Sequence, residues 1–192
     1  MAIRSDAQHW GSLAKTFHWL IVAAILVQGT VGLVMINLPR RPSVIPVYSF
    51  HKSLGLTILA LAVLRLAWRA FDRRPELPPD MPRWQVIAAR ASHVLLYVLL
   101  FALPLSGWLF DSIASLRPLY WWGLVRMPSL TGGALPAWKD AAANLHAALF
   151  WTLVGMAALH AAAALKHHLI DRNNALRRML PGRLRSDTGT HD

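Results

Sequence analysis

The sequence of 192 residues contains no cysteine, and only 15% of its residues are charged. Without cysteine the chain has no disulfide, no thiolate-ligated haem, no cysteine-ligated iron–sulfur cluster and no C-x-x-C-H site for covalent haem attachment. Acidic residues are scarce, since nine Asp and Glu stand against 20 Lys and Arg, and the formal net charge is +11. Such a charge is typical of nucleic-acid-binding proteins, but a soluble protein of that class is rarely 55% hydrophobic. We therefore expect no nucleic-acid partner.

Long apolar segments are what the sequence has instead. A membrane-spanning helix needs about 20 predominantly apolar residues, and four segments meet this requirement: 17–38, 51–70, 86–110 and 141–170. The first is longer than the apolar part of a typical signal peptide and has no clear small-residue cleavage site, so we interpret it as retained. The sequence predicts an all-α integral membrane four-helix bundle within residues 1–180, followed by a flexible cytoplasmic tail at 181–192.

The distribution of basic residues predicts the orientation of this bundle. Fourteen of the 20 Lys and Arg lie in the N-terminus, the second connection and the C-terminal tail, counted with the adjoining helix ends. Cytoplasmic loops carry the excess of Lys and Arg, so both termini are predicted to be cytoplasmic. The six others lie in the first and third connections: Arg40, Arg41, Lys52, Arg117, Arg126 and Lys139.

Five of the nine histidines fall within the predicted spans and clear of their cytoplasmic exits, where an ionisable residue is a functional candidate. The first helix runs outward and the second inward, so His18 is expected near the cytoplasmic face and His51 near the opposite face. His146 and His160 share the fourth helix, and the 14 residues between them correspond to roughly 21 Å along one face. An inner layer therefore pairs His18 with His160. An outer layer pairs His51 with His146, and His93 of the third helix is left over.

Two opposed imidazoles on facing helices supply the axial ligands of a six-coordinate haem iron. Arg65 follows His51 by 14 residues, which predicts a guanidinium at the inner layer, able to pair with a haem propionate. Gly29 and Gly32 return to the face of His18 one layer up, where the lack of a side chain would leave space for a macrocycle.

Other interpretations of these residues are available. A single histidine within a span is often a hydrogen-bonded polar residue at a helix interface. The glycines can equally serve close helix packing, and Arg65 can extend to the membrane surface. A bare zinc or copper site suits the pattern less well, because two ligands per layer are too few and no carboxylate or thiolate lies at these depths.

Five short strings carry a resemblance to a known family. They are FHWL around His18, HKSLGL from His51 with Arg65 downstream, HVLLYVLLFALPLSG from His93, NLH ending at His146, and LHAAAALKHH around His160. Over nearly its whole length the chain resembles the bacterial cytochrome b561 family. The resemblance implies a bacterial inner-membrane cytochrome with two b-type haems, surrounded by membrane lipid, that passes electrons between a donor and the quinone pool. Some compact members of the family oxidise superoxide and reduce ubiquinone, and this chain is similar to them in length.

In such a cytochrome, axial ligation by the four paired histidines leaves no open position on iron, so outer-sphere electron transfer is expected. His167 lies seven residues beyond His160, about 10 Å nearer the cytoplasm, where it would hydrogen-bond or protonate a quinone oxygen. Lys166 and His168 are its neighbours, and the alternative role of all three is to anchor the helix at the interface. The family pattern has a histidine at His93 too, so we expect it near the inner haem or the quinone. A rival pairing with His93 in place of His18 stays open.

Three classes of function follow from the sequence. The first is a stand-alone superoxide:quinone type oxidoreductase, the second a membrane subunit that relays electrons for a hydrogenase or dehydrogenase, and the third a haem-free transporter or channel. The short connections give a large partner little to hold, which favours the first class. The third connection, 111–140, resembles the family least and is the expected docking site of a small anionic donor or redox protein. Its side of the bundle carries a net charge of +4, which would attract superoxide, although solvated loop charge explains it equally well.

Overall fold

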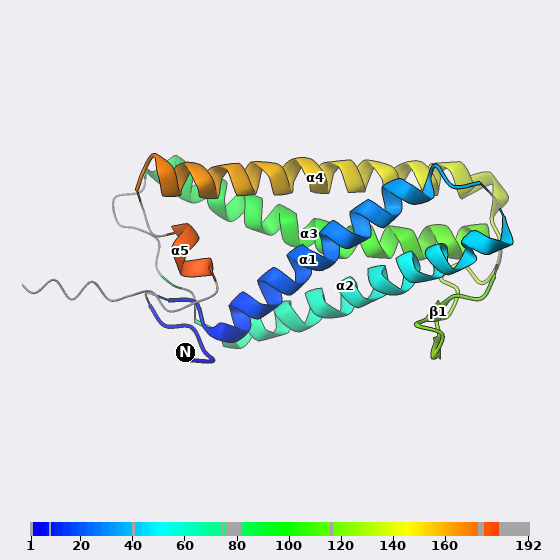
Figure 1. Cartoon of the computed structure of the whole chain (residues 1–192), viewed down its shortest axis with the longest axis horizontal. Helices are drawn as coiled ribbons and strands as arrows, with labels where there is room; N and C mark the ends of the chain where they lie inside the picture. The colour runs from blue at the N-terminus through cyan, green and yellow to red at the C-terminus, as the bar shows by residue number, and fades with distance from the viewer. Residues whose placement is uncertain are drawn as a thin grey trace, which may run out of the picture.

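The computed structural model describes residues 2–7, 9–39, 41–73, 75, 82–115, 117–172 and 175–180. Four long helices run along its longest axis (Figure 1), and each contains a stretch long and apolar enough to cross a membrane. They are α1 (Ser12–Met35), α2 (Ile45–Phe71), α3 (Arg83–Ala114) and α4 (Lys139–Leu169). The all-α four-helix membrane bundle predicted from the sequence is thereby confirmed. The predicted tail at 181–192 and Arg40 lie outside the described residues.

All four helices begin before the apolar segments that predicted them. Hydropathy marks only the part long and apolar enough to cross the hydrocarbon, whereas α1, α3 and α4 begin in polar residues. Proline helps to set two of these starts: Pro46 lies in the first turn of α2, and Pro82 precedes the first residue of α3. The first helix also ends earlier than predicted, at Met35, where the Asn37 side chain donates a hydrogen bond of 3.1 Å to the Leu33 carbonyl and Pro39 follows.

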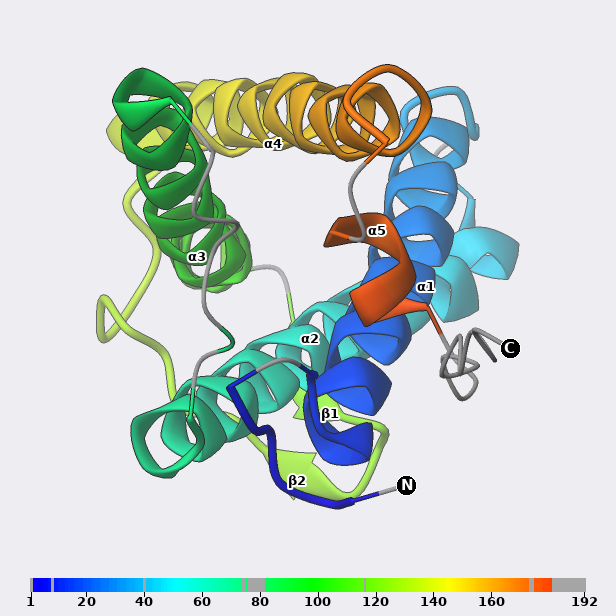
Figure 2. The ribbon, with the colours of Figure 1, turned by 90° about the vertical axis from the view of Figure 1, so that its left-hand side faces the viewer.

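Seen end-on, the four helices form a ring (Figure 2) in which α1 packs against α2, α2 against α3, and α3 against α4. The buried apolar core lies between the first three helices and consists of Ile21, Ile58, Ala62 and Leu100. One end of the bundle carries the N-terminal residues 2–7 and 9–11 and a short helix, α5 (Ala175–Met179), and we call it the terminus end. The opposite end carries two short strands and is called the hairpin end.

The hairpin is a feature that hydropathy did not predict. Strand β1 (Tyr120–Trp121) pairs antiparallel with β2 (Val125–Arg126), and the turn between them contains Trp122 and Gly123, both with positive φ. Ser53 and Thr57 of α2 fasten it to the bundle. The Trp122 backbone N–H donates to Ser53 Oγ at 3.0 Å, and the indole N–H groups of both tryptophans donate to Thr57 Oγ1 at 3.0 and 2.9 Å. Two 3₁₀ turns, η1 (Pro42–Val44) and η2 (Pro136–Trp138), complete this end.

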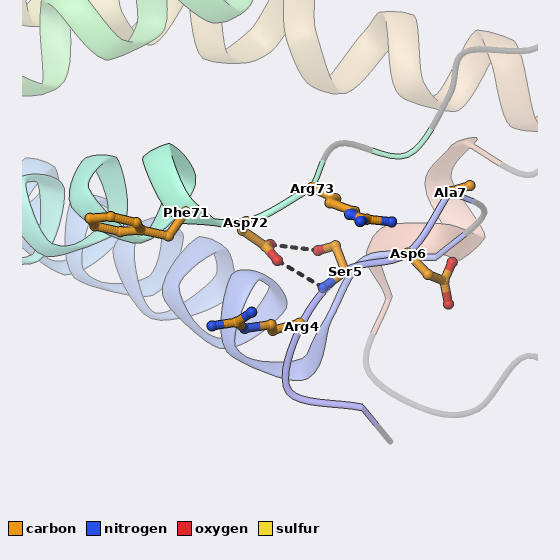
Figure 3. A pocket seen from close by; sticks show the side chains of 7 residues that line it. All are labelled: Arg4, Ser5, Asp6, Ala7, Phe71, Asp72 and Arg73. Atoms are coloured by element: carbon orange, nitrogen blue, oxygen red, sulfur yellow. Dashed lines mark hydrogen bonds between the residues drawn. The ribbon is translucent and has the colours of Figure 1, made fainter.

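At the terminus end, two further segments fold back onto the helices. The Lys15 ammonium and the Trp19 indole N–H of α1 donate to the Leu180 and Met179 carbonyls at 3.2 and 2.8 Å, which ties α5 to α1. The N-terminal segment is held by Asp72, whose carboxylate accepts from the Ser5 N–H at 2.8 Å and from the Ser5 hydroxyl at 2.6 Å (Figure 3). A pocket of about 320 Å³ lies beside this clasp.

Candidate functional site

His51 of α2 and His146 of α4 face each other toward the hairpin end of the bundle. Their ring centroids are 6.4 Å apart and their planes cross at 83°. A metal held between two imidazole nitrogens at about 2 Å from each places the two centroids roughly 6 Å apart. The Nδ1 atom of His51 is buried without a hydrogen-bond partner among the described residues. The pair therefore fits axial ligation of one haem iron.

A glycine backs each of these two rings. A Cβ atom on Gly32 of α1 would lie 3.2 Å from Cε1 of His51, and one on Gly107 of α3 would lie 3.0 Å from Cε1 of His146. Both separations are tighter than ordinary van der Waals contact, so each ring rests directly against the backbone of a neighbouring helix. Gly29, the other glycine singled out in the sequence, lies against Phe150. The glycines thus help to fix the positions of the two rings.

Ser106 of α3 is a site residue that no sequence motif indicated. It is buried, with 6% of its surface exposed, and its Oγ lies 2.8 Å from Nδ1 of His146. The same oxygen donates a hydrogen bond of 2.7 Å to the Leu103 carbonyl, one turn back on α3. Serine is common within helices, and only the three-dimensional placement against α4 distinguishes this one.

A second cluster lies toward the terminus end and contains more residues than the sequence predicted. Arg65 of α2 donates from Nη1 to Nδ1 of His18 at 3.2 Å and from Nε to the Tyr97 hydroxyl at 3.1 Å. The rings of His93 and His160 are in edge contact, with centroids 5.2 Å apart. Tyr97 lies one turn from His93 on α3, which joins the two groups. Four helices therefore contribute to this cluster.

The structure divides the histidines between two clusters, with one addition to the predicted pairs. His51 lies with His146, and His18 lies in the same cluster as His160. The addition is His93, whose ring contacts His160, while His18 is hydrogen-bonded to Arg65. The choice between His18 and His93 as partner of His160 stays a prediction. Within the described part of the chain, no three His, Asp or Glu side chains form a group that could hold a metal ion without a macrocycle.

The candidate quinone residues lie in the last turn of α4. The Lys166 ammonium and Nδ1 of His167 approach the same oxygen of Asp171, at 2.7 and 2.6 Å, and His168 follows in the same turn. These hydrogen bonds lower the pKa of the Asp171 carboxyl below its usual value, those from Lys166 and His167 contributing in that order. Cationic side chains also stabilise a helix C-terminus, which is the structural alternative for this group. Asp171 was not among the predicted site residues.

The third connection forms a pocket of about 560 Å³ at the hairpin end. Its lining includes two arginines, Arg117 and Arg126, and three serines of α3 and the connection. Asp111 of α3, which also lines the pocket, is ion-paired with Lys52 of α2. Positively charged groups therefore dominate this face of the described structure, where the sequence predicts the donor to dock.

The chain is similar in sequence to a known family and to several individual proteins. The sequence profile of the prokaryotic cytochrome b561 family matches residues 9–182. The chain is 35% identical to cytochrome b561 homolog 2 of Escherichia coli K12 over 198 aligned residues, which cover 98% of this chain and all of the relative. It is 32% identical to cytochrome b561 homolog 1 of the same organism, over 69% of this chain and 74% of the relative. A protein of Yersinia pestis named probable superoxide oxidase CybB is 29% identical, over 85% and 91% of the two chains.

Proposed function

Because this chain belongs to the prokaryotic cytochrome b561 family, whose members are membrane cytochromes, we propose that it carries two b-type haems and transfers electrons from superoxide to ubiquinone. The family itself accounts for b-type haem, electron transfer and a bacterial membrane location. The observation that carries the two-haem proposal is the separation of the histidines into two clusters, each with imidazoles from facing helices. Membership of a cytochrome family argues against a haem-free transporter or channel.

In this proposal His51 and His146 hold the haem nearer the hairpin end, and His18 and His160 hold the other. The bound haem supplies reversible one-electron chemistry. Two histidines per iron would leave no position for a donor to bind the metal, so the protein would act by holding the two groups and by setting their potentials. Gly32 and Gly107 support this role, because they let the two hairpin-end rings rest on rigid helix backbone.

Arg65 has to change its partner in this scheme. An arginine only donates hydrogen bonds, so its bond to Nδ1 of His18 places the proton of the neutral ring on Nε2. A histidine that ligates iron through Nε2 needs that atom free of a proton. We therefore propose that haem binding releases Arg65 from His18, and that the guanidinium then pairs with a haem propionate.

The quinone is proposed to bind at the terminus end, which the distribution of Lys and Arg assigns to the cytoplasm. His167 would hydrogen-bond a quinone oxygen and supply a proton, while its bond to Asp171 orients the ring. Lys166 shares that carboxylate, and His168 and His93 complete the candidate set.

The donor is proposed to approach the opposite, hairpin end. Arg117 and Arg126 at the pocket of the third connection would attract a small anion. The name of the Yersinia pestis relative supports superoxide as that anion. Each superoxide would give up one electron at the hairpin end and leave as dioxygen, and two such electrons with two protons would convert ubiquinone to ubiquinol.

The experiment is to purify the protein from bacterial membranes, quantify haem against protein, and record oxidised and reduced spectra. The proposal predicts two haems per chain, a Soret band, and ubiquinol formation when superoxide is generated in the presence of ubiquinone. A protein without a Soret band would contradict the cytochrome assignment. A dihaem protein that leaves ubiquinone oxidised in the presence of superoxide would overturn the donor and acceptor.

A further inference from the structure

The two histidines of the hairpin-end pair have different hydrogen-bonding environments. Nδ1 of His51 is buried and lacks a hydrogen-bond partner among the described residues. Nδ1 of His146 lies 2.8 Å from the buried hydroxyl of Ser106. The two rings otherwise resemble each other, since a glycine of a neighbouring helix backs each of them. The hydroxyl is therefore the feature that distinguishes the two proposed ligands of one haem.

The position of the single hydroxyl proton of Ser106 follows from its second contact. Ser106 Oγ lies 2.7 Å from the Leu103 carbonyl oxygen, which has no proton to give. Two oxygens at this distance require a proton between them, and it comes from the serine. With its proton committed to Leu103, Ser106 presents only lone pairs to His146. The hydrogen bond between them is therefore donated by Nδ1–H of the imidazole.

We infer that Ser106 is a positioning residue that fixes His146 as the Nδ1–H tautomer and so presents its Nε2 lone pair to the haem iron. The inference rests on the proposed role of His146 as an axial ligand. A neutral imidazole has one proton, so a proton held on Nδ1 leaves Nε2 free to ligate. The acceptor on Nδ1–H also raises the basicity of the ligand, as hydrogen-bond partners of metal-bound histidines generally do.

This geometry depends on the local structure of α3. Pro104, between Leu103 and Ser106, has no N–H, so the Leu100 carbonyl lacks its usual helical donor. Gly107 follows directly and lets the ring of His146 approach within contact of the α3 backbone. A serine side chain is short enough to reach back to its own helix and across to α4 at once. Ser106 and Gly107 thus contact one edge of the His146 ring, at Nδ1 and Cε1.

The predicted consequence concerns the potential of one haem. A more basic ligand stabilises ferric iron relative to ferrous iron, so the bond from His146 to Ser106 lowers the midpoint potential of the haem at the hairpin end. Ser106→Ala removes the acceptor with little change in volume. We expect that variant to raise the midpoint potential of one haem and to shift one of two low-spin ferric EPR signals. The other haem should keep its potential and its signal.

Two further variants distinguish the effect of the hydrogen bond on the haem potential from the effect of side-chain packing. Ser106→Thr keeps the hydroxyl and should retain the wild-type potential and EPR signals. Ser92→Ala is a matched control, because Ser92 lies on the same helix and donates a similar bond of 3.0 Å to the Ala89 carbonyl three residues back. It should leave the haem at the hairpin end unchanged. A shift in Ser106→Thr as large as that in Ser106→Ala would overturn the inference.

Failure of the inference can be told apart from failure of the proposed function by adding His146→Ala. If this variant loses one haem and Ser106→Ala leaves both potentials and both EPR signals unchanged, Ser106 has no positioning role and the ligand assignment stands. If His146→Ala keeps both haems, the ligand assignment is wrong and the inference falls with it. The expected result is one haem lost in His146→Ala and one haem shifted in Ser106→Ala.

Discussion

The two histidine clusters of this bundle differ in the hydrogen bonds and ring contacts that their side chains already make. At the hairpin end, His51 and His146 face each other at 6.4 Å, and their rings contact glycines and one serine hydroxyl. At the terminus end, His18 accepts a hydrogen bond from Arg65, and His160 contacts His93. The first cluster needs no exchange of partners to ligate iron, whereas the second does. The same helices thus build two proposed cofactor sites, one rigid and one adjustable.

The adjustable site is also the one next to the proposed quinone. His93, Arg65 and Tyr97 add polar groups there, and α5 is hydrogen-bonded to α1 close to His18. A site that exchanges protons with a quinone needs such groups, while a site that only relays electrons does not. The difference between the two ends therefore matches the different chemistry proposed for each.

The largest expected effect is a loss of haem that distinguishes His18 from His93 as the partner of His160. If His18 is the partner of His160, His18→Ala should lose about half of the haem, because a six-coordinate site cannot hold its cofactor normally with one axial ligand. His93→Ala should keep both haems. Haem and protein quantification of the two purified variants makes the test. The reverse result, with His93→Ala losing haem, would establish the rival pairing.

A smaller effect is expected from Arg65. Its positive charge stabilises a reduced haem, so Arg65→Gln should lower the midpoint potential of the haem at the terminus end by on the order of 1 kcal/mol, or about 40 mV. The haem at the hairpin end should not change. Redox titration followed by absorption measures both transitions. Equal shifts in the two haems would contradict the assignment of Arg65 to one cluster.

The positive charge at the hairpin end should appear in the kinetics with superoxide. The Debye length falls from about 30 Å at 0.01 M salt to about 3 Å at 1 M, so haem reduction by superoxide should slow about tenfold over this range. Arg126→Ala at the hairpin end should lower the rate at low salt, and Arg177→Ala at the terminus end should not. Pulse radiolysis or stopped flow with generated superoxide measures the rates. A rate independent of salt would argue against electrostatic steering.

The smallest effect concerns Asp171 at the end of α4. Its folded-state pKa lies below its usual value, so its contribution to stability is present above that value and is lost as pH falls through the lower, folded pKa. Asp171→Asn should slightly lower the Tm at pH 7, and the difference in Tm from the wild type should shrink as the pH falls through the folded pKa of the carboxyl. The carboxyl is exposed, so a shift of several degrees at pH 7 would contradict this account.

Hydropathy and spacing predicted the parts of the molecule that have a strong one-dimensional signal. Four long apolar runs gave the bundle, and a 14-residue interval along α4 gave two histidine layers, because helix geometry converts sequence spacing directly into depth. The hairpin at 120–126 was missed because each strand has two residues and depends on contacts with Ser53 and Thr57 of α2. Ser106 was missed for the same reason, since its role depends on which residue of α4 lies opposite it.

The measurement that tests the central claim most directly is the haem content of double variants. If His51 and His146 ligate the same haem, the His51→Ala and His146→Ala changes together should leave one haem per chain, the same as either change alone. Combining His51→Ala with His160→Ala should leave none. The contradicting result is a double variant of His51 and His146 that has lost both haems while the combination of His51 and His160 keeps one.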